Sequence, residues 1–365
     1  MPLPVEVADL TPETMTALLT PGAPGLRVDT VAVLDAHSGT TGRARVALTY
    51  ADAAGLPPTL FVKLEPFDPR QRVFVRAGGI GANEAHLYRD CAAELPMRIP
   101  RIHAAAVDDD GGYVTVMEDL LASGCTFPRP SDAGVADHAR STIDGLAALH
   151  ARFWASPRFG ADLAWVPERA GFGADGGHGD QAVAGAGHFV RKALAQIGDE
   201  QPAVFRAVGD VYATRTRAVL DAWDVGERTL IHGDPHSGNL FLDGPTVGFL
   251  DWGMVSRSPG MRDVAYYCCN SLPTDVRRAL ENELVDRWLE ILARAGVVLD
   301  RAEAWEQYRM FSVYSWVSAV STASVGSRWQ PEERAVAAMD RTTAALDDLD
   351  ALGALTDRLA RLEAR

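Results

Sequence analysis

Apolar residues recur at every second position in several short runs between residues 31 and 117. Val31 and Val33 alternate with other residues, and the same period of two returns in the runs that follow. This spacing is typical of strands that are buried on one face. The pattern predicts a five-stranded antiparallel sheet with strands around residues 31–33, 46–50, 60–64, 99–107 and 113–117.

Two helices are predicted in the same part of the chain. A Thr N-cap, a Pro and an acidic residue at positions 11–13 predict a short helix that ends near Leu19. A second helix, over residues 82–91, is the one helix expected within the sheet region, and it carries Glu84 on its apolar face. Because a buried carboxylate is costly unless it is paired, we expect Glu84 to meet a cation. Lys63 of the third strand is the natural partner.

Helical spacing dominates after residue 120. Residues 157–187 are rich in Gly and predict a long surface loop. Short strands are expected around residues 229–232, 239–242 and 246–250, and the helical pattern resumes at Arg262. The predicted helices span residues 132–154, 188–196, 203–223 and, near the end of the chain, 341–365.

Composition narrows the class of protein. A chain of 365 residues is too long for one ordinary core, so two domains are expected. The net charge of −14 argues against a nucleic-acid partner, which requires a basic surface. Residues 1–9 lack a signal-peptide pattern, there is no long apolar run, and the four cysteines form no Cys-x-x-Cys pair. We therefore expect a cytoplasmic protein with reduced thiols and no membrane partner.

One stretch of the chain carries candidate chemistry. In His232-Gly233-Asp234-Pro235-His236-Ser237-Gly238-Asn239, an Asp and an Asn stand five residues apart, and Asp251 follows twelve residues later. Protein kinases use this spacing for phosphoryl transfer. Asp234 is the candidate base for the acceptor hydroxyl, and Asn239 and Asp251 are candidate oxygen ligands for Mg²⁺, a hard cation.

Other residues are expected to support this stretch. Lys63 would contact nucleotide phosphates, and Glu84 would hold Lys63 in place. His232 is expected to form a hydrogen bond with the backbone of the loop rather than to titrate, and Asp263 to brace the same loop. His236 is interpreted equally well as a packing residue or as a catalytic one.

Alternative interpretations concern His and aromatic residues. His150 fits a hydrogen-bonded core histidine better than a ligand. A metallohydrolase site built from His232, Asp234 and His236 is disfavoured, because no further cluster with metal-ligand spacing supports it. The aromatic residues at 305–316 fit a helical core better than a substrate pocket.

The chain resembles the aminoglycoside phosphotransferase and choline-kinase superfamily. The Met-Glu-Asp-Leu segment at 117–120, the Leu-His-Ala-x-Phe-Trp helix and the 38–42 loop are most similar to the ecdysteroid-kinase-like branch and its bacterial relatives. The segments that carry the resemblance are residues 62–63, 83–84, 117–120, 146–154, 232–239, 251–253 and 263–267.

This resemblance implies an α+β, bilobal, protein-kinase-like fold. Its N-lobe would span residues 1–117, its hinge 118–120, and its helical C-lobe with the catalytic loop 121–365. The resemblance implies Mg²⁺ and ATP, or GTP, as cofactors and a small-molecule alcohol as substrate, in a monomer or homodimer. The nucleotide would be bound by the loop residues Ser38, Gly39 and Thr40, by Lys63 and Glu84, and by the hinge near Glu118 and Leu120.

The chain departs from its relatives at three points. The nucleotide loop reads Gly39-x-x-Gly42 and lacks the three glycines of protein kinases. Pro235 stands where many relatives have Leu. Gly253 stands where choline kinases tend to have a second acid, which favours the aminoglycoside-kinase side. None of these changes removes a catalytic group.

Three hypotheses on function remain open at this point. The first is phosphorylation of a small-molecule hydroxyl. The second is antibiotic inactivation, with an aminoglycoside or a macrolide as the acceptor. The third, of a different class, is a catalytically silent nucleotide-binding scaffold, against which the presence of Lys63, Asp234, Asn239 and Asp251 argues.

Overall fold

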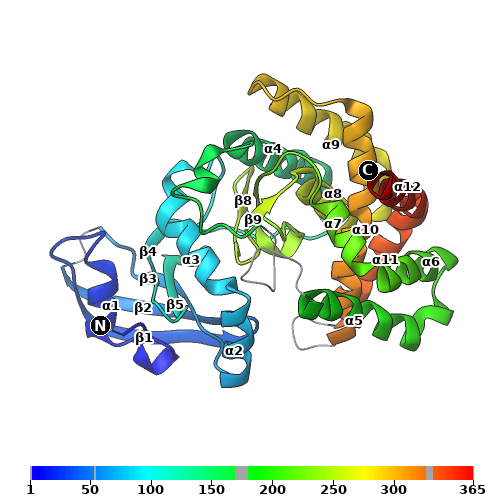
Figure 1. The fold of residues 1–365 in the computed structure, drawn as a ribbon. Helices are drawn as coiled ribbons and strands as arrows, with labels where there is room; N and C mark the ends of the chain where they lie inside the picture. The colour runs from blue at the N-terminus through cyan, green and yellow to red at the C-terminus, as the bar shows by residue number, and fades with distance from the viewer. Residues whose placement is uncertain (1, 53–54, 169–179, 326–331, 365) are drawn as a thin grey trace. The chain divides into compact units, whose positions relative to one another are not determined.

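The chain forms two compact units in a computed structural model, which describes residues 2–52, 55–168, 180–325 and 332–364. The first unit comprises Met1–Thr126 together with Phe241–Val255, and the second comprises Phe127–Leu240 and Ser256–Arg365. The predicted division at residues 117–120 assigned Phe241–Val255 to the second part, whereas the structure groups it with the first. Figure 1 traces the order of the elements.

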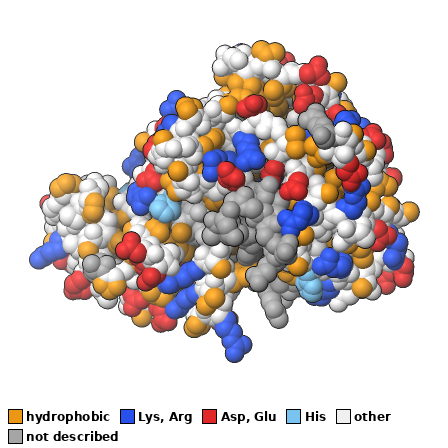
Figure 2. Space-filling view, viewed as in Figure 1, with side chains coloured by type: hydrophobic (Ala, Val, Ile, Leu, Met, Phe, Trp, Pro, Cys, Tyr) orange, Lys and Arg blue, Asp and Glu red, His pale blue; other side chains and the backbone are white. Residues whose placement is uncertain are grey.

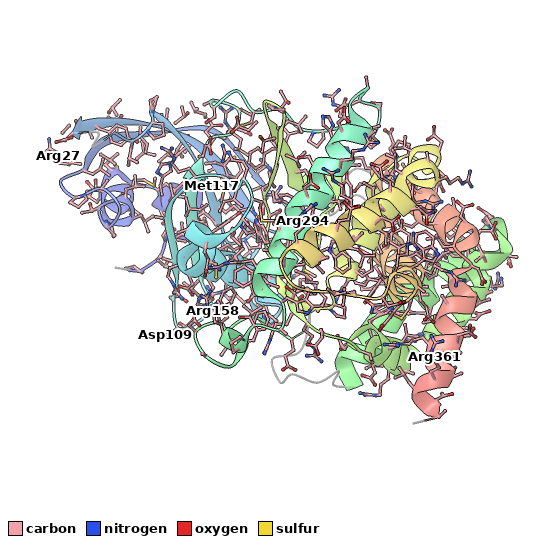
Figure 3. All side chains as sticks on the ribbon, turned by 90° about the horizontal axis from the view of Figure 1, so that it is seen from above. Arg27, Asp109, Met117, Arg158, Arg294 and Arg361 are labelled. Atoms are coloured by element: carbon pink, nitrogen blue, oxygen red, sulfur yellow. The ribbon has the colours of Figure 1, made fainter. Side chains whose placement is uncertain are left out.

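A five-stranded antiparallel sheet builds the first unit, as predicted, in the order β1-β2-β3-β5-β4. Alternate side chains of β2 and β3 are buried against α1 (Pro12–Leu19), whose N-cap Thr11 accepts a hydrogen bond from the Thr14 N–H. Met117, near the end of β5, is labelled in Figure 3. The strands are β1 (Arg27–Ser38), β2 (Gly42–Asp52), β3 (Thr59–Leu64), β4 (Ile102–Val107) and β5 (Tyr113–Glu118).

The first unit contains a helix that we did not predict. Besides the expected α3 (Ile80–Cys91), the helix α2 (Pro69–Ala77) follows β3. Its start has a recognisable signal, because Asp68 caps the helix and Pro69 is its first residue. Only Val75 of α2 is buried, so the helix has almost no apolar periodicity to reveal it. The hairpin of β7 (Leu240–Asp243) and β8 (Thr246–Phe249) leads to Asp251.

The second unit is mostly helical. Its helix α10 packs against α5, α8, α11 and α12, and Figure 1 shows α10, α11 and α12 lying together. A short strand, β6 (Thr229–Ile231), pairs with β9 (Ser256–Ser258), which was not predicted. The helices are α4 (Val135–Phe153), α5 (Asp180–Ile197), α6 (Ala203–Thr214), α7 (Thr216–Trp223), α8 (Met261–Ser271), α9 (Thr274–Arg294), α10 (Arg301–Val325), α11 (Glu332–Asp348) and α12 (Ala351–Glu363).

Three predicted segments differ in the structure. The Gly-rich segment 157–187 is not one loop, because α5 already begins at Asp180; residues 169–179 lie outside the described residues. The helix predicted over 203–223 is divided at Arg215 into α6 and α7. The long final helix is also two helices, because Asp350 has a φ of 43° and its carboxylate accepts a hydrogen bond from the Gly353 N–H, the start of α12.

All four cysteines are buried thiols outside any disulfide. Within the described ranges, no helix is both long and apolar enough to cross a membrane. On the face drawn in Figure 2, basic and acidic side chains are interspersed.

Candidate functional site

Three of the predicted site residues meet in the first unit. The Nζ atom of Lys63, on β3, lies 2.7 and 2.9 Å from the two carboxylate oxygens of Glu84, on α3, so the predicted pairing is confirmed. Lys63 Nζ also lies 3.0 Å from Oδ1 of Asp251. Lys63 and Glu84 are only 4% and 1% exposed. Burial raises the pKa of Glu84, and the adjacent ammonium of Lys63 opposes that shift.

Asp251 has an unusual backbone conformation. It follows β8 and has a φ of 64°, which lies in the left-handed region that residues other than glycine rarely adopt. The next residue, Trp252, is buried, and its N–H donates to Glu84 at 3.2 Å. Strain of this kind costs on the order of 1–3 kcal/mol and persists where the surroundings fix the conformation, often at functional sites.

A second cation contacts Asp251, and the sequence analysis did not identify it. Arg43 Nη2 lies 3.2 Å from Oδ2 of Asp251. Arg43 is on β2 directly opposite Lys63 on β3, so the sheet register places both cations side by side. The signal that could have found Arg43 is its position one residue after Gly42, at the start of the strand that pairs with the Lys63 strand.

The turn that carries Ser38, Gly39 and Thr40 is fastened to the chain beyond β3. The Ser38 hydroxyl accepts a hydrogen bond from the Phe67 N–H at 3.0 Å, and the Gly39 N–H donates to the Thr41 carbonyl at 3.0 Å. A Cβ on Gly42 would lie 2.3 Å from the Glu65 carbonyl oxygen, so only glycine fits there. The turn is therefore held in place directly before Arg43.

The predicted hinge uses several of its polar groups within the chain. The Glu118 carboxylate accepts from Arg98 at 2.9 and 3.0 Å and from the Arg101 N–H at 2.9 Å. Burial alone would raise the pKa of Glu118, but these hydrogen bonds outweigh it and lower that pKa. The Glu118 N–H donates to the Arg101 carbonyl, and the Leu120 carbonyl accepts from the Cys125 N–H. These carboxylate and backbone groups are therefore already hydrogen-bonded within the chain.

The loop with Asp234 lies in the second unit, between β6 and β7. Asp263, buried on α8, accepts from the His232 N–H at 2.7 Å and from the Gly233 N–H at 2.9 Å. The Asp234 N–H donates to Nδ1 of His232 at 3.3 Å. The predicted contacts of Asp263 and His232 with this loop are therefore confirmed. Within the described residues, no group of three or more His, Cys, Asp or Glu is placed to hold a metal.

The Asp234 carboxylate is held from several sides. The Tyr266 hydroxyl donates to Oδ1 at 2.6 Å. Asn239 Nδ2 lies 3.1 Å from Oδ2 and 2.9 Å from the Asp234 carbonyl, and His236 Nε2 lies 3.5 Å from Oδ2. Because Asn239 uses its amide nitrogen for both of these bonds, its amide oxygen is the atom that suits a hard cation. Asp251, in the first unit, offers carboxylate oxygens, which are also a donor type that Mg²⁺ prefers.

Tyr266 and Tyr314 also contact the Asp234 loop, and sequence reasoning assigned them no such contact. Tyr266 is buried, and its hydroxyl lies 3.1 Å from the Ser318 hydroxyl. Burial and the nearby Asp234 raise the pKa of Tyr266 well above 10, so it remains a donor. The Tyr314 hydroxyl donates to the Gly233 carbonyl at 3.3 Å, and the Arg262 guanidinium stacks 3.9 Å from its ring centre.

His150 and several aromatic residues of α10 lie in the core. His150 is fully buried, accepts from Trp288 Nε1 at 2.9 Å and lies 3.3 Å from Asp263, as expected of a core histidine. Of the aromatic residues at 305–316, Tyr308, Phe311 and Trp316 are buried in the core as expected, whereas Trp305 and Tyr314 are only partly buried.

One open hollow in the second unit contains none of the predicted site residues. Its volume is 610 Å³, and Arg191, Thr216 and Asp221 are among its lining residues.

Comparisons with known proteins bear on the family and the fold. A family model described as the phosphotransferase enzyme family matches residues 45–289. A crystal structure of choline kinase from Cryptosporidium parvum Iowa II is 11% identical with a TM-score of 0.52, and the match covers 94% of this chain and 97% of that one. An ethanolamine kinase from Plasmodium vivax is 12% identical with a TM-score of 0.50, over 92% and 84% of the two chains.

A macrolide 2'-phosphotransferase from Brachybacterium faecium is 19% identical with a TM-score of 0.45, over 89% and 98% of the two chains. No curated protein matches the chain in a sequence comparison. The similarities in structure confirm the predicted fold class, an α+β kinase-like fold with a five-stranded antiparallel sheet and a mostly helical remainder.

Proposed function

We propose that this chain, which belongs to the phosphotransferase enzyme family, transfers the terminal phosphoryl group of Mg·ATP or Mg·GTP to a hydroxyl of a small molecule. The observation that carries the proposal is the set of contacts around Asp251 and Asp234. In the first unit a buried lysine is fixed between Glu84 and Asp251. In the second unit a partly exposed Asp234 is held beside Asn239 on a braced loop. Phosphoryl transfer needs a cation for the phosphates, oxygen ligands for the metal and a carboxylate for the acceptor hydroxyl, and these residues are of those types.

The proposed nucleotide contacts belong mainly to the first unit. Lys63 would neutralise phosphate oxygens, and its bonds to Glu84 keep its ammonium in one position before the nucleotide arrives. Asp251 and Asn239 would hold Mg²⁺ through oxygen atoms. The bound Mg·nucleotide supplies the phosphoryl group and offsets the charge that develops during transfer.

Asp234 is proposed as the residue that orients the acceptor hydroxyl and takes its proton. Its side chain is 30% exposed, so an acceptor can reach it, while hydrogen bonds from Tyr266 and Asn239 fix the plane of the carboxylate. A fixed carboxylate reduces the entropy lost in aligning the hydroxyl for transfer. His236 lies beside the same carboxylate and would help to orient it.

A screen of hydroxyl compounds tests this proposal. The full chain is incubated with Mg·ATP or Mg·GTP and a panel of amino alcohols, lipophilic alcohols, aminoglycosides and macrolides, and release of nucleoside diphosphate is measured. We expect release that depends on at least one compound and is lost in Asp234→Asn. A folded protein that releases no diphosphate with any compound would contradict the proposal, and if it still binds nucleotide in calorimetry, it would instead support the silent nucleotide-binding scaffold.

A further inference from the structure

Asp251 is contacted by two cations at once, although it is a proposed ligand of a third. Oδ1 lies 3.0 Å from Lys63 Nζ, and Oδ2 lies 3.2 Å from Arg43 Nη2. Both proposed metal-binding oxygens of this carboxylate are therefore occupied by positive side chains. All three residues belong to the first unit.

The two cations differ in how firmly they are held. Lys63 is almost fully buried and has a dedicated partner, because Glu84 binds it through both oxygens. Arg43 has 31% of its side chain exposed, and its Nε donates to the Thr41 hydroxyl at 3.3 Å. Asp251 is the carboxylate in contact with Arg43. Lys63 therefore keeps a partner when Asp251 takes up a metal, whereas Arg43 loses the charge that holds it.

The charge balance of the site shows what Arg43 would bind next. The four groups Lys63, Arg43, Glu84 and Asp251 are neutral as a set. A divalent cation on Asp251 repels the neighbouring guanidinium and leaves the set positive. A polyphosphate supplies the missing negative charge, and a guanidinium matches phosphate oxygens with two parallel N–H groups.

We propose that Arg43 is a second phosphate-binding residue, which occupies the metal-binding carboxylate of Asp251 until a metal–nucleotide complex displaces it. The register of the sheet supports this role, since it fixes Arg43 opposite Lys63. The turn before Arg43 is held by the hydrogen bond from the Phe67 N–H to Ser38 and by the close packing of Gly42 against the Glu65 carbonyl. The start of β2 therefore stays in place while the Arg43 side chain moves. The inference rests on the proposed function, because it names a further residue for the same nucleotide.

Three binding measurements on Arg43→Gln test the proposal. Mn²⁺ alone is titrated and followed by electron paramagnetic resonance, and Mg·ATP, Mg·GTP and the two nucleosides are titrated by calorimetry. The matched control is Arg27→Gln, on β1, which makes the same charge change at an exposed arginine that pairs with a neighbouring surface carboxylate, Asp29. A thermal melt of each variant verifies folding. The second variant is Arg43→Lys, which keeps the positive charge but lacks the two parallel N–H groups of the guanidinium.

Arg43→Gln should have opposite effects on the affinity for the Mg·nucleotide and on the affinity for Mn²⁺ alone, which a purely structural role would not produce. In Arg43→Gln we expect binding of the Mg·nucleotide to weaken roughly ten- to a hundredfold, as for the loss of one charge-assisted pair. Binding of Mn²⁺ alone should tighten, because its competitor is gone, and nucleoside binding should stay within about twofold. Arg43→Lys should retain part of the nucleotide affinity, and Arg27→Gln should match the wild type.

The outcomes separate this inference from the proposed function. If Arg43→Gln binds the Mg·nucleotide as the wild type does, Arg43 is not a phosphate ligand. If nucleotide, nucleoside and Mn²⁺ affinities all fall together, the residue acts through structure, and the inference is equally overturned. If the wild-type protein itself binds neither nucleotide, the proposed function fails, and this inference fails with it.

Discussion

Asp263 is the residue whose loss should disturb the Asp234 loop most. It is fully buried on α8 and accepts hydrogen bonds from the His232 and Gly233 N–H groups, at 2.7 and 2.9 Å. His150 Nε2 lies 3.3 Å from the same carboxylate. Because Trp288 donates to Nδ1 of His150, the proton of a neutral His150 is on Nε2 and points to Asp263. Asp263→Ala thus removes one acceptor from three buried donors.

The free energy of unfolding that Asp263→Ala loses can be worked out from these contacts. A buried N–H without an acceptor costs about 1–3 kcal/mol, so the two backbone groups alone contribute about 2–6 kcal/mol. Native domains are stable by only about 5–15 kcal/mol. We therefore expect Asp263→Ala to lose a large part of the stability of the second unit or to open residues 229–239 locally. Asp263→Asn keeps one acceptor oxygen, so it should lose about half as much stability as Asp263→Ala.

Amide hydrogen exchange is the assay that distinguishes the two cases. Exchange in residues 229–239 is compared between the wild type, both Asp263 variants and Asp210→Ala, an exposed acid of α6 in the same unit. Urea denaturation monitors global stability, and the control should stay within about 0.5 kcal/mol of the wild type. If Asp263→Ala leaves both the exchange of this segment and the urea midpoint unchanged, the bracing of the loop by Asp263 is refuted.

Three further predictions follow from other contacts. Tyr266→Phe should lower kcat roughly ten- to a hundredfold, which corresponds to the loss of one hydrogen bond to a charged group, while the KM for nucleotide stays the same. The control Tyr267→Phe should not lower kcat in this selective way. A parallel rise in KM would contradict the role of Tyr266 in holding Asp234. Burial alone would raise the pKa of Asp119, but its bonds to Arg45 lower it, so ionised Asp119 stabilises the fold above its unfolded pKa. The stability gap between the wild type and Asp119→Asn, about 1–3 kcal/mol at pH 7 in urea denaturation, should therefore close as the pH falls below about 4; a constant gap would be inconsistent with this sign. Chelation of divalent cations should abolish phosphoryl transfer and added Mg²⁺ should restore it, whereas metal-independent turnover would exclude the proposed roles of Asn239 and Asp251.

Much of the fold could be predicted because its signals are local. Alternating apolar residues in β2 and β3 face a core formed with α1, so the period of two was readable in the sequence. The Lys63–Glu84 pair was also predictable, since a carboxylate on an apolar helix face needs a cation. The bracing of the loop by Asp263 followed from its place just beyond Asp251 in the chain.

The features that were missed depend on contacts between distant segments. Arg43 becomes part of the site only through the β2–β3 register and the return of residues 241–255 to the first unit. Tyr266 reaches Asp234 because α8 lies beside the loop, which no spacing in the sequence reveals. The break at Asp350 depends on one backbone angle and a carboxylate cap, within a segment whose apolar pattern continues through it.

Transfer of phosphate to an acceptor is the measurement that tests the central claim most directly. The wild type and Asp234→Asn are incubated with Mg·ATP or Mg·GTP and an acceptor identified in the screen, and the phosphorylated product is quantified by ³¹P nuclear magnetic resonance. We expect a phosphate ester from the wild type, and at least a hundredfold slower formation by Asp234→Asn with nucleotide affinity unchanged. Ester formation by Asp234→Asn at the wild-type rate would contradict the assignment of Asp234 as the base.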